Sequence, residues 1–435
     1  MTPVLDMDID LMGAQPALFK LYTQLAFIFP LPESDAEGQK TSQQHRVTST
    51  VTTGLAELAA HFPWVAGQVV NTNPDSTQAA PPPHYKIRPH EPAPQLVPAP
   101  VMLTQISYIR GGLVLCVNMQ HNVCDMMGQA AVMGWLSQAC SGEYFTENEL
   151  GIGNMTRVDV VPLLEEQGWL PGPELQNQLF PPPPEPATVG EEADTTTVER
   201  KVPEAPSKCA WTYFDFSAES LEALKGLATA TLPQDFNGFI STDDALSAFI
   251  FSSVLRARQS RLRLDASVTF ARAVDARRYL DIHPDYPGIL QNMAYTSYKL
   301  DSLLSTPLGR IAAEMRQAVD PLTSDVAYRT RSLVTFLSQS PNNAAKTSFT
   351  ATLDMSVDIA LSSWTKVPAY EWDFGFGLGP PVAVRRPGFV PMESLMYLMP
   401  KSPEGSIAVA MCLREEDMQR LMQDKEWNKA ARYVG

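Results

Sequence analysis

Six histidines supply the candidate acid-base chemistry of this chain. They are His45, His61, His84, His90, His121 and His283. No two of them stand at the spacing that metal ligands use, so the sequence predicts no metal site. All but His121 and His283 lie beside prolines, in loops or at a polar helix start, which favours surface or packing roles.

His121 stands where a predicted strand ends and a predicted helix begins. The segment 112–120 (GLVLCVNMQ) is rich in branched apolar residues and predicts a buried strand, and a helical pattern follows from Asp125 to Cys140. A side chain at such a junction is held rigidly and still faces a cavity. An imidazole has an ordinary pKa of roughly 6.5, close to what a general base needs. These features favour His121 as a general base.

Asp125 and Cys124 follow in the segment HNVCD, and spacing alone leaves their roles open. A carboxylate at the first turn of a helix accepts hydrogen bonds from unpaired backbone N–H groups, so Asp125 is either a helix cap or a catalytic partner of His121. Cys124 is either a nucleophile or a buried apolar thiol, and its apolar surroundings favour the thiol.

Other common catalytic chemistries lack their motifs in this sequence. There is no G-x-x-x-x-G-K-[ST] loop, no complete G-x-G-x-x-G after a strand, no G-x-S-x-G elbow and no H-E-x-x-H. General acid-base catalysis therefore remains as the chemistry to be explained.

Composition bounds the partners and the compartment. A length of 435 residues with 44% hydrophobic residues supports two or three domains. The net charge of -15, without a basic run, argues against a nucleic acid or an anionic membrane as partner. The five scattered cysteines indicate reduced thiols. With no signal-like or bilayer-spanning segment in the sequence, the expected location is cytoplasmic.

Two proline-rich stretches, 78–100 and 181–206, punctuate the chain. The second offers almost nothing to bury, so it is predicted to link an N-terminal domain (1–180) to a C-terminal domain (207–435). In the second half, Ser241 stands three residues before Asp244 and ahead of an apolar stripe, which predicts a helix start. Alternation over 407–413 predicts a half-buried strand, and 415–434 has helical composition.

Several segments together resemble the BAHD superfamily of acyl-CoA-dependent transferases. HNVCD matches the family's H-x-x-x-D motif, and ARAVDAR (271–277) and WDFGFG (372–377) match two more, with Phe376 where the usual D-F-G-W-G has tryptophan. A more specific resemblance, to the fungal trichothecene 3-O-acetyltransferases, spans nearly the whole chain in collinear order. It rests on FPWVAGQV (62–69), RGGLVLCVNMQH (110–121), FTENEL (145–150), STDDALSAFI (241–250), YPGILQNM (286–293), LSSWTKV (361–367), RRPGFVPMESLMY (385–397) and DKEWNKAARYVG (424–435).

The resemblance implies an α/β fold of two chloramphenicol-acetyltransferase-like mixed-sheet domains with the active-site channel between them. It implies that His121 is the general base that takes the proton of an acceptor hydroxyl. It further implies that Asp125 pairs with Arg277 instead of orienting His121, although a triad-like role for Asp125 stays open. Asp373 is expected to begin a structural turn far from His121.

The resemblance also implies acetyl-CoA, or another acyl-CoA, as co-substrate and no permanently bound cofactor. The helix start at Ser241 and Thr242 is expected to offer hydroxyls and free N–H groups to CoA phosphates. The full set of expected CoA contacts is Ser241, Thr242, Ser363, Trp364, Arg385 and Arg386. The protein is expected to act as a monomer.

The identity of the acceptor is the feature about which the sequence says least. Between Val70 and Gln105 this chain has only the first proline-rich stretch, where the trichothecene enzymes carry a longer insert that helps to wall the acceptor pocket. The expected acceptor is a hydroxyl of a trichothecene-like terpenoid or another fungal secondary metabolite. Open alternatives are an amine, polyketide or alkaloid acceptor, a longer acyl donor, a non-transfer reaction, or a catalytically silent binding protein. The intact set of His121, Asp125 and Arg277 argues against silence.

Overall fold

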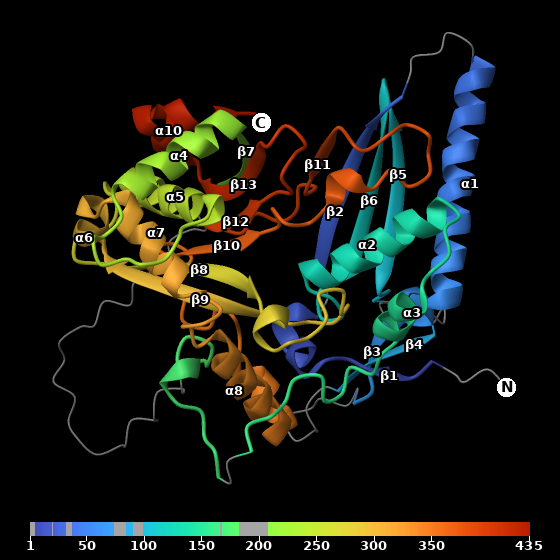
Figure 1. Cartoon of the computed structure of the whole chain (residues 1–435), viewed down its shortest axis with the longest axis horizontal. Coiled ribbons are helices and arrows are strands. Elements are labelled where there is room, and N and C mark those ends of the chain that lie inside the picture. Colours follow the sequence, from blue (N-terminus) through green and yellow to red (C-terminus); the bar gives the residue numbers. More distant parts are fainter. Residues whose placement is uncertain are drawn as a thin grey trace, which may run out of the picture.

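The computed structural model describes residues 5–19, 21–31, 37–73, 84–89, 99–165, 168–181 and 208–435. The expected linker 181–206, apart from its first residue, and most of the stretch 78–100 lie outside these residues. The described strands form three sheets, and helices cover the two larger ones (Figure 1). This is the α/β fold that the sequence predicts, with one mixed sheet among the three described sheets.

Both halves of the chain contain strands and helices. The strands are β1 (Met7–Asp8), β2 (Tyr22–Pro30), β3 (Gly67–Asn71), β4 (Tyr85–Pro89), β5 (Met102–Ile109), β6 (Gly112–Gln120), β7 (Cys209–Phe216), β8 (Ser267–Asp275), β9 (Gln291–Lys299), β10 (Ile359–Ser363), β11 (Ala383–Arg385), β12 (Leu395–Leu398), β13 (Ile407–Arg414) and β14 (Arg432–Tyr433). The helices are α1 (Glu37–His61), α2 (Met126–Cys140), α3 (Glu147–Gly153), α4 (Ala218–Ala230), α5 (Thr242–Arg258), α6 (Leu300–Ser305), α7 (Leu308–Gln317), α8 (Val326–Gln339), α9 (Glu415–Gln423) and α10 (Lys425–Ala430).

The first large sheet has the strand order β11-β2-β6-β5 and is antiparallel where its pairs are recorded. Alternate residues of β2 and β6, such as Phe27 and Leu115, are fully buried. They share one core with apolar residues of α1 and α2, such as Val47 and Met133. Both helices therefore pack on one face of this sheet (Figure 1). A small sheet with the strand order β1-β4-β3 lies near the C-terminal end of α1.

The second large sheet has the order β14-β7-β13-β12-β10-β8-β9. It is mixed, because β10 runs parallel to both β12 and β8 while the other pairs are antiparallel. One face carries Phe214, Val409 and Met411, which share a core with α4, α5, α7, α9 and α10. The residues that alternate with them, such as Tyr213 and Ala410, therefore point to the opposite face.

Strand β11 belongs to the first sheet although it comes from the second half of the chain. It pairs with β2 in the register Arg385 with Ala26. The WDFGFG loop also joins the first core, where Phe374 and Phe376 are buried against Phe27 and Phe29. The second half of the chain thus supplies a strand to the first sheet and a loop to its core. The predicted domain boundaries of 1–180 and 207–435 do not include this exchange.

Two local predictions need correction. The strand predicted over 407–413 is β13, but it is buried on both faces instead of one, because the intervening Ala408, Ala410 and Cys412 are also buried. The helical segment predicted over 415–434 is divided: Asp424 ends α9, caps α10 by accepting from Glu426 N, and the chain then returns to the sheet as β14.

Candidate active site

His121 directly follows the last residue of strand β6. Its backbone N–H donates to the carbonyl of Leu21 at 2.7 Å, which ties the residue to the start of β2. The side chain is partly exposed, and its Nδ1 is buried with no hydrogen-bond partner in the described chain. Burial lowers the pKa of His121 below its ordinary value of 6.5, and the positive charge of Arg386 acts in the same direction against the charge of Asp125. The imidazole is therefore neutral at pH 7 and free to accept a proton.

The Asp125 carboxylate is saturated by contacts that do not include His121. One oxygen accepts from Gly128 N at 2.8 Å, which caps α2, and the other accepts from Leu290 N at 2.7 Å. Arg277 donates to both oxygens, at 2.9 Å each, and both side chains are almost fully buried. The carboxylate thus joins α2 of the first half to Arg277 and the loop before β9 of the second half.

The Arg277 guanidinium is itself fully coordinated. It donates to the carbonyls of Tyr286 and Gly288, at 2.9 and 2.8 Å from Nη2, and to Asp275 Oδ1 at 2.8 Å from Nη1. Burial alone would lower the pKa of Arg277, but the carboxylates of Asp125 and Asp275 raise it above its usual value. Such a buried and complete ion pair fixes the geometry around it.

The loop 286–290 approaches α2 so closely that only a glycine fits at the first turn. A Cβ on Gly128 would lie 2.2 Å from the carbonyl oxygen of Pro287. A second buried network supports the same loop: Asp10 accepts from Tyr286 Oη, from Ile289 N and from Arg157. Arg157 also donates to the carbonyl of Val123, two residues after His121. This network could not be predicted from the sequence, because no local pattern links residues so far apart in the chain.

Ser241 does begin a helix, but its hydroxyl is not free. It forms a capping box with Asp244 at the start of α5 and also accepts from Arg316 Nη2 at 2.8 Å. The expectation of an open hydroxyl at this helix start therefore does not hold for Ser241. Thr242 is partly exposed in the first turn. Ser363, at the end of β10, donates to the carboxylate of Asp243 in the same turn. The structure thus brings together three of the expected CoA contacts.

The other three expected CoA contacts lie around a group of aromatic rings. Trp364 is buried and its ring centroid is 4.7 Å from that of Tyr397. The Arg386 guanidinium stacks on Tyr397, at 4.6 Å from the ring centroid, and on Phe389, at 3.5 Å. Arg385 lies over the ring of Tyr213 at 5.7 Å. The aromatic partners were not singled out from the sequence, although Phe389 and Tyr397 lie within the segment RRPGFVPMESLMY.

Asp373 lies away from His121. It is exposed and accepts from Gly375 N at 2.9 Å in the turn that packs against the C-terminal end of α2. His121 precedes the other end of that helix, whose fifteen residues span about 22 Å at roughly 1.5 Å per residue. Phe374 has a φ of 54°, a conformation that is uncommon for a residue with a side chain, and Gly375 and Gly377 continue the turn with φ of 64° and 66°.

The other candidate catalytic residues lack a comparable arrangement of side chains. Among the other histidines His45, His84 and His283 are exposed, His61 is partly exposed, and His90 lies outside the described residues. Cys124 is buried, and burial raises the pKa of its thiol to about 12, so a nucleophilic thiolate is not available. In the described residues no three His, Cys, Asp or Glu side chains could hold a metal ion, and no described helix is long and apolar enough to cross a membrane.

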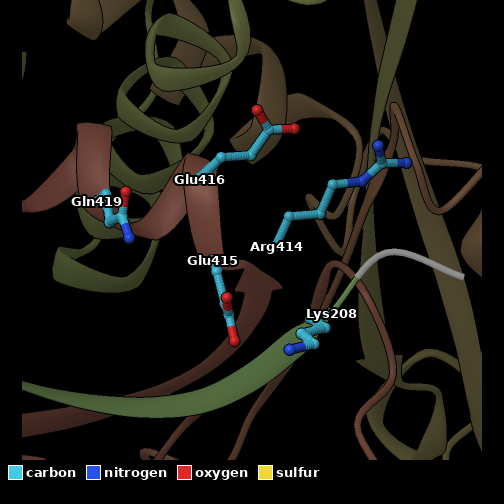
Figure 2. A pocket seen from close by; sticks show the side chains of 5 residues that line it. All are labelled: Lys208, Arg414, Glu415, Glu416 and Gln419. Atoms are coloured by element: carbon cyan, nitrogen blue, oxygen red, sulfur yellow. The ribbon is translucent and has the colours of Figure 1, made fainter.

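A surface hollow of about 370 Å³ beside the start of α9 is also distinct from this site (Figure 2). Figure 2 shows the side chains that line it, which are those of Lys208, Arg414, Glu415, Glu416 and Gln419. It contains no histidine and none of the expected contacts to substrate, and its charges of both signs favour no one ligand.

Comparison with known proteins adds independent evidence. Residues 73–428 match the model of the transferase family, and residues 21–99 match that of the trichothecene 3-O-acetyltransferase-like N-terminal domain. The chain is 38% identical to the trichothecene 3-O-acetyltransferase of Fusarium sporotrichioides, over 99% of this chain and 97% of that one. It is 35% identical to the protein of the same name from Saccharomyces cerevisiae, over 98% and 95% of the two chains.

Solved structures agree with the sequence comparisons. A crystal structure of the F. sporotrichioides protein in complex with coenzyme A and T-2 superposes with a TM-score of 0.85 at 37% identity, covering 99% of this chain and all of that one. Vinorine synthase has the same fold at 14% identity, with a TM-score of 0.62 over 99% of this chain and 94% of the other.

Proposed function

Because this chain belongs to the BAHD transferase family and is an acyltransferase with an acyl-CoA as co-substrate, we propose that it transfers an acetyl group from acetyl-CoA to a hydroxyl of a small acceptor. In this proposal the acceptor is a trichothecene-like terpenoid or another fungal secondary metabolite, and His121 is the general base. No permanently bound cofactor takes part.

One observation carries the assignment of His121. Its imidazole is partly exposed, has no hydrogen bond to the carboxylate of Asp125 and has a lowered pKa. A neutral imidazole accepts a proton at physiological pH and gives it back within the same turnover. No other described histidine combines partial exposure with a buried ring nitrogen that has no hydrogen-bond partner.

The reaction then needs a single residue for its proton transfers. His121 takes the proton of the acceptor hydroxyl while the oxygen forms a bond to the thioester carbonyl carbon, and the carbonyl electron pair moves onto its oxygen. When this pair returns, the bond to sulfur breaks, and the CoA thiolate takes the proton from the His121 imidazolium. Both substrates are bound together, so no acyl-enzyme is required.

The other residues support this reaction without taking protons. The contacts of Asp125 and Arg277 favour a structural role for both, and those of Asp373 favour a role in the turn alone. Contact with CoA stays a prediction for Ser241, Thr242, Ser363, Trp364, Arg385 and Arg386. The location in the cytoplasm and the monomeric state stay predictions as well.

A direct assay tests the proposal. The purified protein is incubated with acetyl-CoA and a panel of hydroxylated terpenoids, and free thiol and product mass are followed. We expect thiol release that depends on the acceptor, together with a product that is heavier by one acetyl group. Release of thiol without an acetylated product, or acetylation of amines alone, would contradict it.

A further inference from the structure

The segment 121–125 contacts two buried ion pairs. One is the pair of Asp125 and Arg277. The other joins Asp10 to Arg157, which follows α3, at 3.2 Å, and both of its side chains are almost fully buried. A buried ion pair is costly unless its remaining donors and acceptors are used, so its other contacts indicate what it does in the fold.

Arg157 contacts the turn that carries the histidine. Its Nη1 donates both to the carbonyl of Val123 and to Asp10 Oδ2, so one nitrogen bridges the backbone of the turn and the carboxylate. The N–H of Val123 donates to the carbonyl of Gln120 at 3.0 Å, which fixes the other polar group of its backbone. His121 and Val123 belong to the same short turn between β6 and α2, so a movement of Val123 also moves the histidine.

The Arg157 guanidinium is itself fixed by contacts on more than one side. It lies over the buried ring of Trp64, with its central carbon 4.6 Å from the ring centroid, which is a favourable site for a cation. Its partner Asp10 also accepts from Tyr286 Oη and from Ile289 N, the latter at 3.2 Å. The donor that reaches the turn is therefore held in a defined position by the protein.

A glycine lets a second segment approach the same turn closely. Gly13 N donates to the carbonyl of Asp10 at 2.9 Å, and a Cβ on Gly13 would overlap the carbonyl oxygen of Asn122, the residue between His121 and Val123. The segment that carries Asp10 therefore packs on the backbone of the turn. This contact with Asn122 and the hydrogen bond to Val123 together leave the turn little room to move.

We propose that Arg157 is a positioning residue for His121, acting through the carbonyl of Val123, and that Asp10 holds its guanidinium in place. This inference rests on the proposed function, because it concerns the reach of the general base to the acceptor hydroxyl. Proton transfer requires the imidazole nitrogen within about 2.6–3.2 Å of that oxygen. A displacement of about 1 Å lowers the rate by about 10²-fold. Because Arg157 acts through the backbone, its loss should lower kcat and leave CoA affinity unchanged.

Arg258 offers a matched control in another part of the molecule. It is equally buried, pairs with Asp417 at 3.1 Å and donates to the carbonyl of Val357 at 2.9 Å, so it also joins an aspartate to a backbone carbonyl. It lies at the C-terminal end of α5, and after Arg258→Met the carboxylate of Asp417 keeps Arg261 as a partner at 2.7 Å. If both arginines were only structural, both substitutions would lower the melting temperature and neither would change kcat of the folded protein.

The test compares Arg157→Met, Arg157→Lys and Arg258→Met at a temperature well below their melting transitions. For Arg157→Met we expect kcat to fall about 10²-fold, with CoA affinity by calorimetry close to wild type. The acid limb of the kcat/KM profile should move to higher pH, because a displaced imidazole loses part of the burial that lowers the pKa of His121. Arg157→Lys keeps a positive charge for Asp10, so it should fold and show a kcat between those of Arg157→Met and wild type. Arg258→Met should have a lower melting temperature with wild-type kcat and an unmoved acid limb.

Wild-type kcat in a folded Arg157→Met would overturn the inference. So would an equal fall of kcat in Arg258→Met, because the effect would then follow from the loss of any buried arginine. If Arg157→Met does not fold, Arg157→Lys decides: a lowered kcat with unchanged CoA affinity supports the inference, and wild-type kcat overturns it. Failure of the proposed function is seen separately, since the wild-type protein would then acetylate no hydroxyl in the panel.

Discussion

Arg277 and Arg386 are both buried arginines, but their surroundings differ. Arg277 donates to two carboxylates and two backbone carbonyls, and its pKa is raised. Arg386 contacts only aromatic rings through its guanidinium within the described chain, and burial lowers its pKa. The first arrangement is complete within the described residues, whereas the second has no acceptor among them.

The difference separates residues that build the site from residues that act in it. A saturated ion pair such as Asp125 with Arg277 cannot bind substrate without breaking contacts that hold the two halves together. An unpartnered buried cation destabilises the protein until a ligand arrives, which is the usual relation between stability and function at active sites. Substitutions at and around these arginines can test this distinction.

The largest expected effect lies at His121. His121→Ala should lower turnover by about 10²- to 10⁴-fold, because a positioned general base contributes that much, while melting temperature and CoA affinity stay close to wild type. Steady-state kinetics, calorimetry with CoA and thermal melting measure the three quantities. His283→Ala, at an exposed position, is the matched control. Near-normal turnover in His121→Ala would exclude it as the base.

The two arginines should respond in opposite ways to the same substitution. Arg277→Met leaves the buried carboxylate of Asp125 without its partner, which costs about 3–5 kcal/mol, so melting temperature and activity should fall together. Arg386→Met removes an unpaired buried charge, and its melting temperature should equal or exceed that of the wild type. Thermal melting of both variants under one set of conditions checks the pair. A large loss of stability in Arg386→Met would show that both arginines are structural.

Asp125→Asn tests the structural role of the ion pair between Asp125 and Arg277. It should lower melting temperature along with activity, and combining it with Arg277→Met should cost less than the sum of the two single changes, because the residues share one contact. A fully stable but inactive Asp125→Asn would instead place Asp125 in a triad-like role beside His121.

A smaller effect is expected at the acceptor pocket. If the short stretch between Val70 and Gln105 leaves the pocket wider than in the trichothecene enzymes, bulkier terpenoid or polyketide alcohols should be preferred over a trichothecene alcohol. Differences in apolar pocket shape are worth about 1–3 kcal/mol, so kcat/KM values should differ by roughly 10- to 200-fold. Clear preference for the trichothecene would contradict the widened pocket.

Local signals predicted the elements that carry His121. Strand β6 and helix α2 have the predicted extents, and Asp125 caps the helix, because apolar periodicity and capping residues act within a few positions. The alternation over β13 predicted a strand buried on one face only, but the small residues between the large ones are also buried. Burial on a second face depends on tertiary packing, which periodicity does not report.

The contacts around Arg386 and Asp10 could not be predicted from spacing. Tyr213 and Arg386 are 173 positions apart, and Asp10 and Tyr286 are 276 positions apart. Nothing in a local pattern distinguishes Arg386 from Arg385, its neighbour in the same segment. Only the fold shows that Arg386 has no acceptor for its buried donors among the described residues, while Arg385 donates to the carbonyl of Val384.

The pH dependence of kcat/KM tests the central claim, that a neutral His121 is the base, most directly. This quantity reports the ionisation of the free enzyme. Because burial lowers the pKa of His121, kcat/KM should be constant around pH 7 and should fall only as the pH drops through a value below 6.5, where the base becomes protonated. The residual activity of His121→Ala should lack this limb. A limb at or above pH 6.5, or one that persists in His121→Ala, would contradict the account.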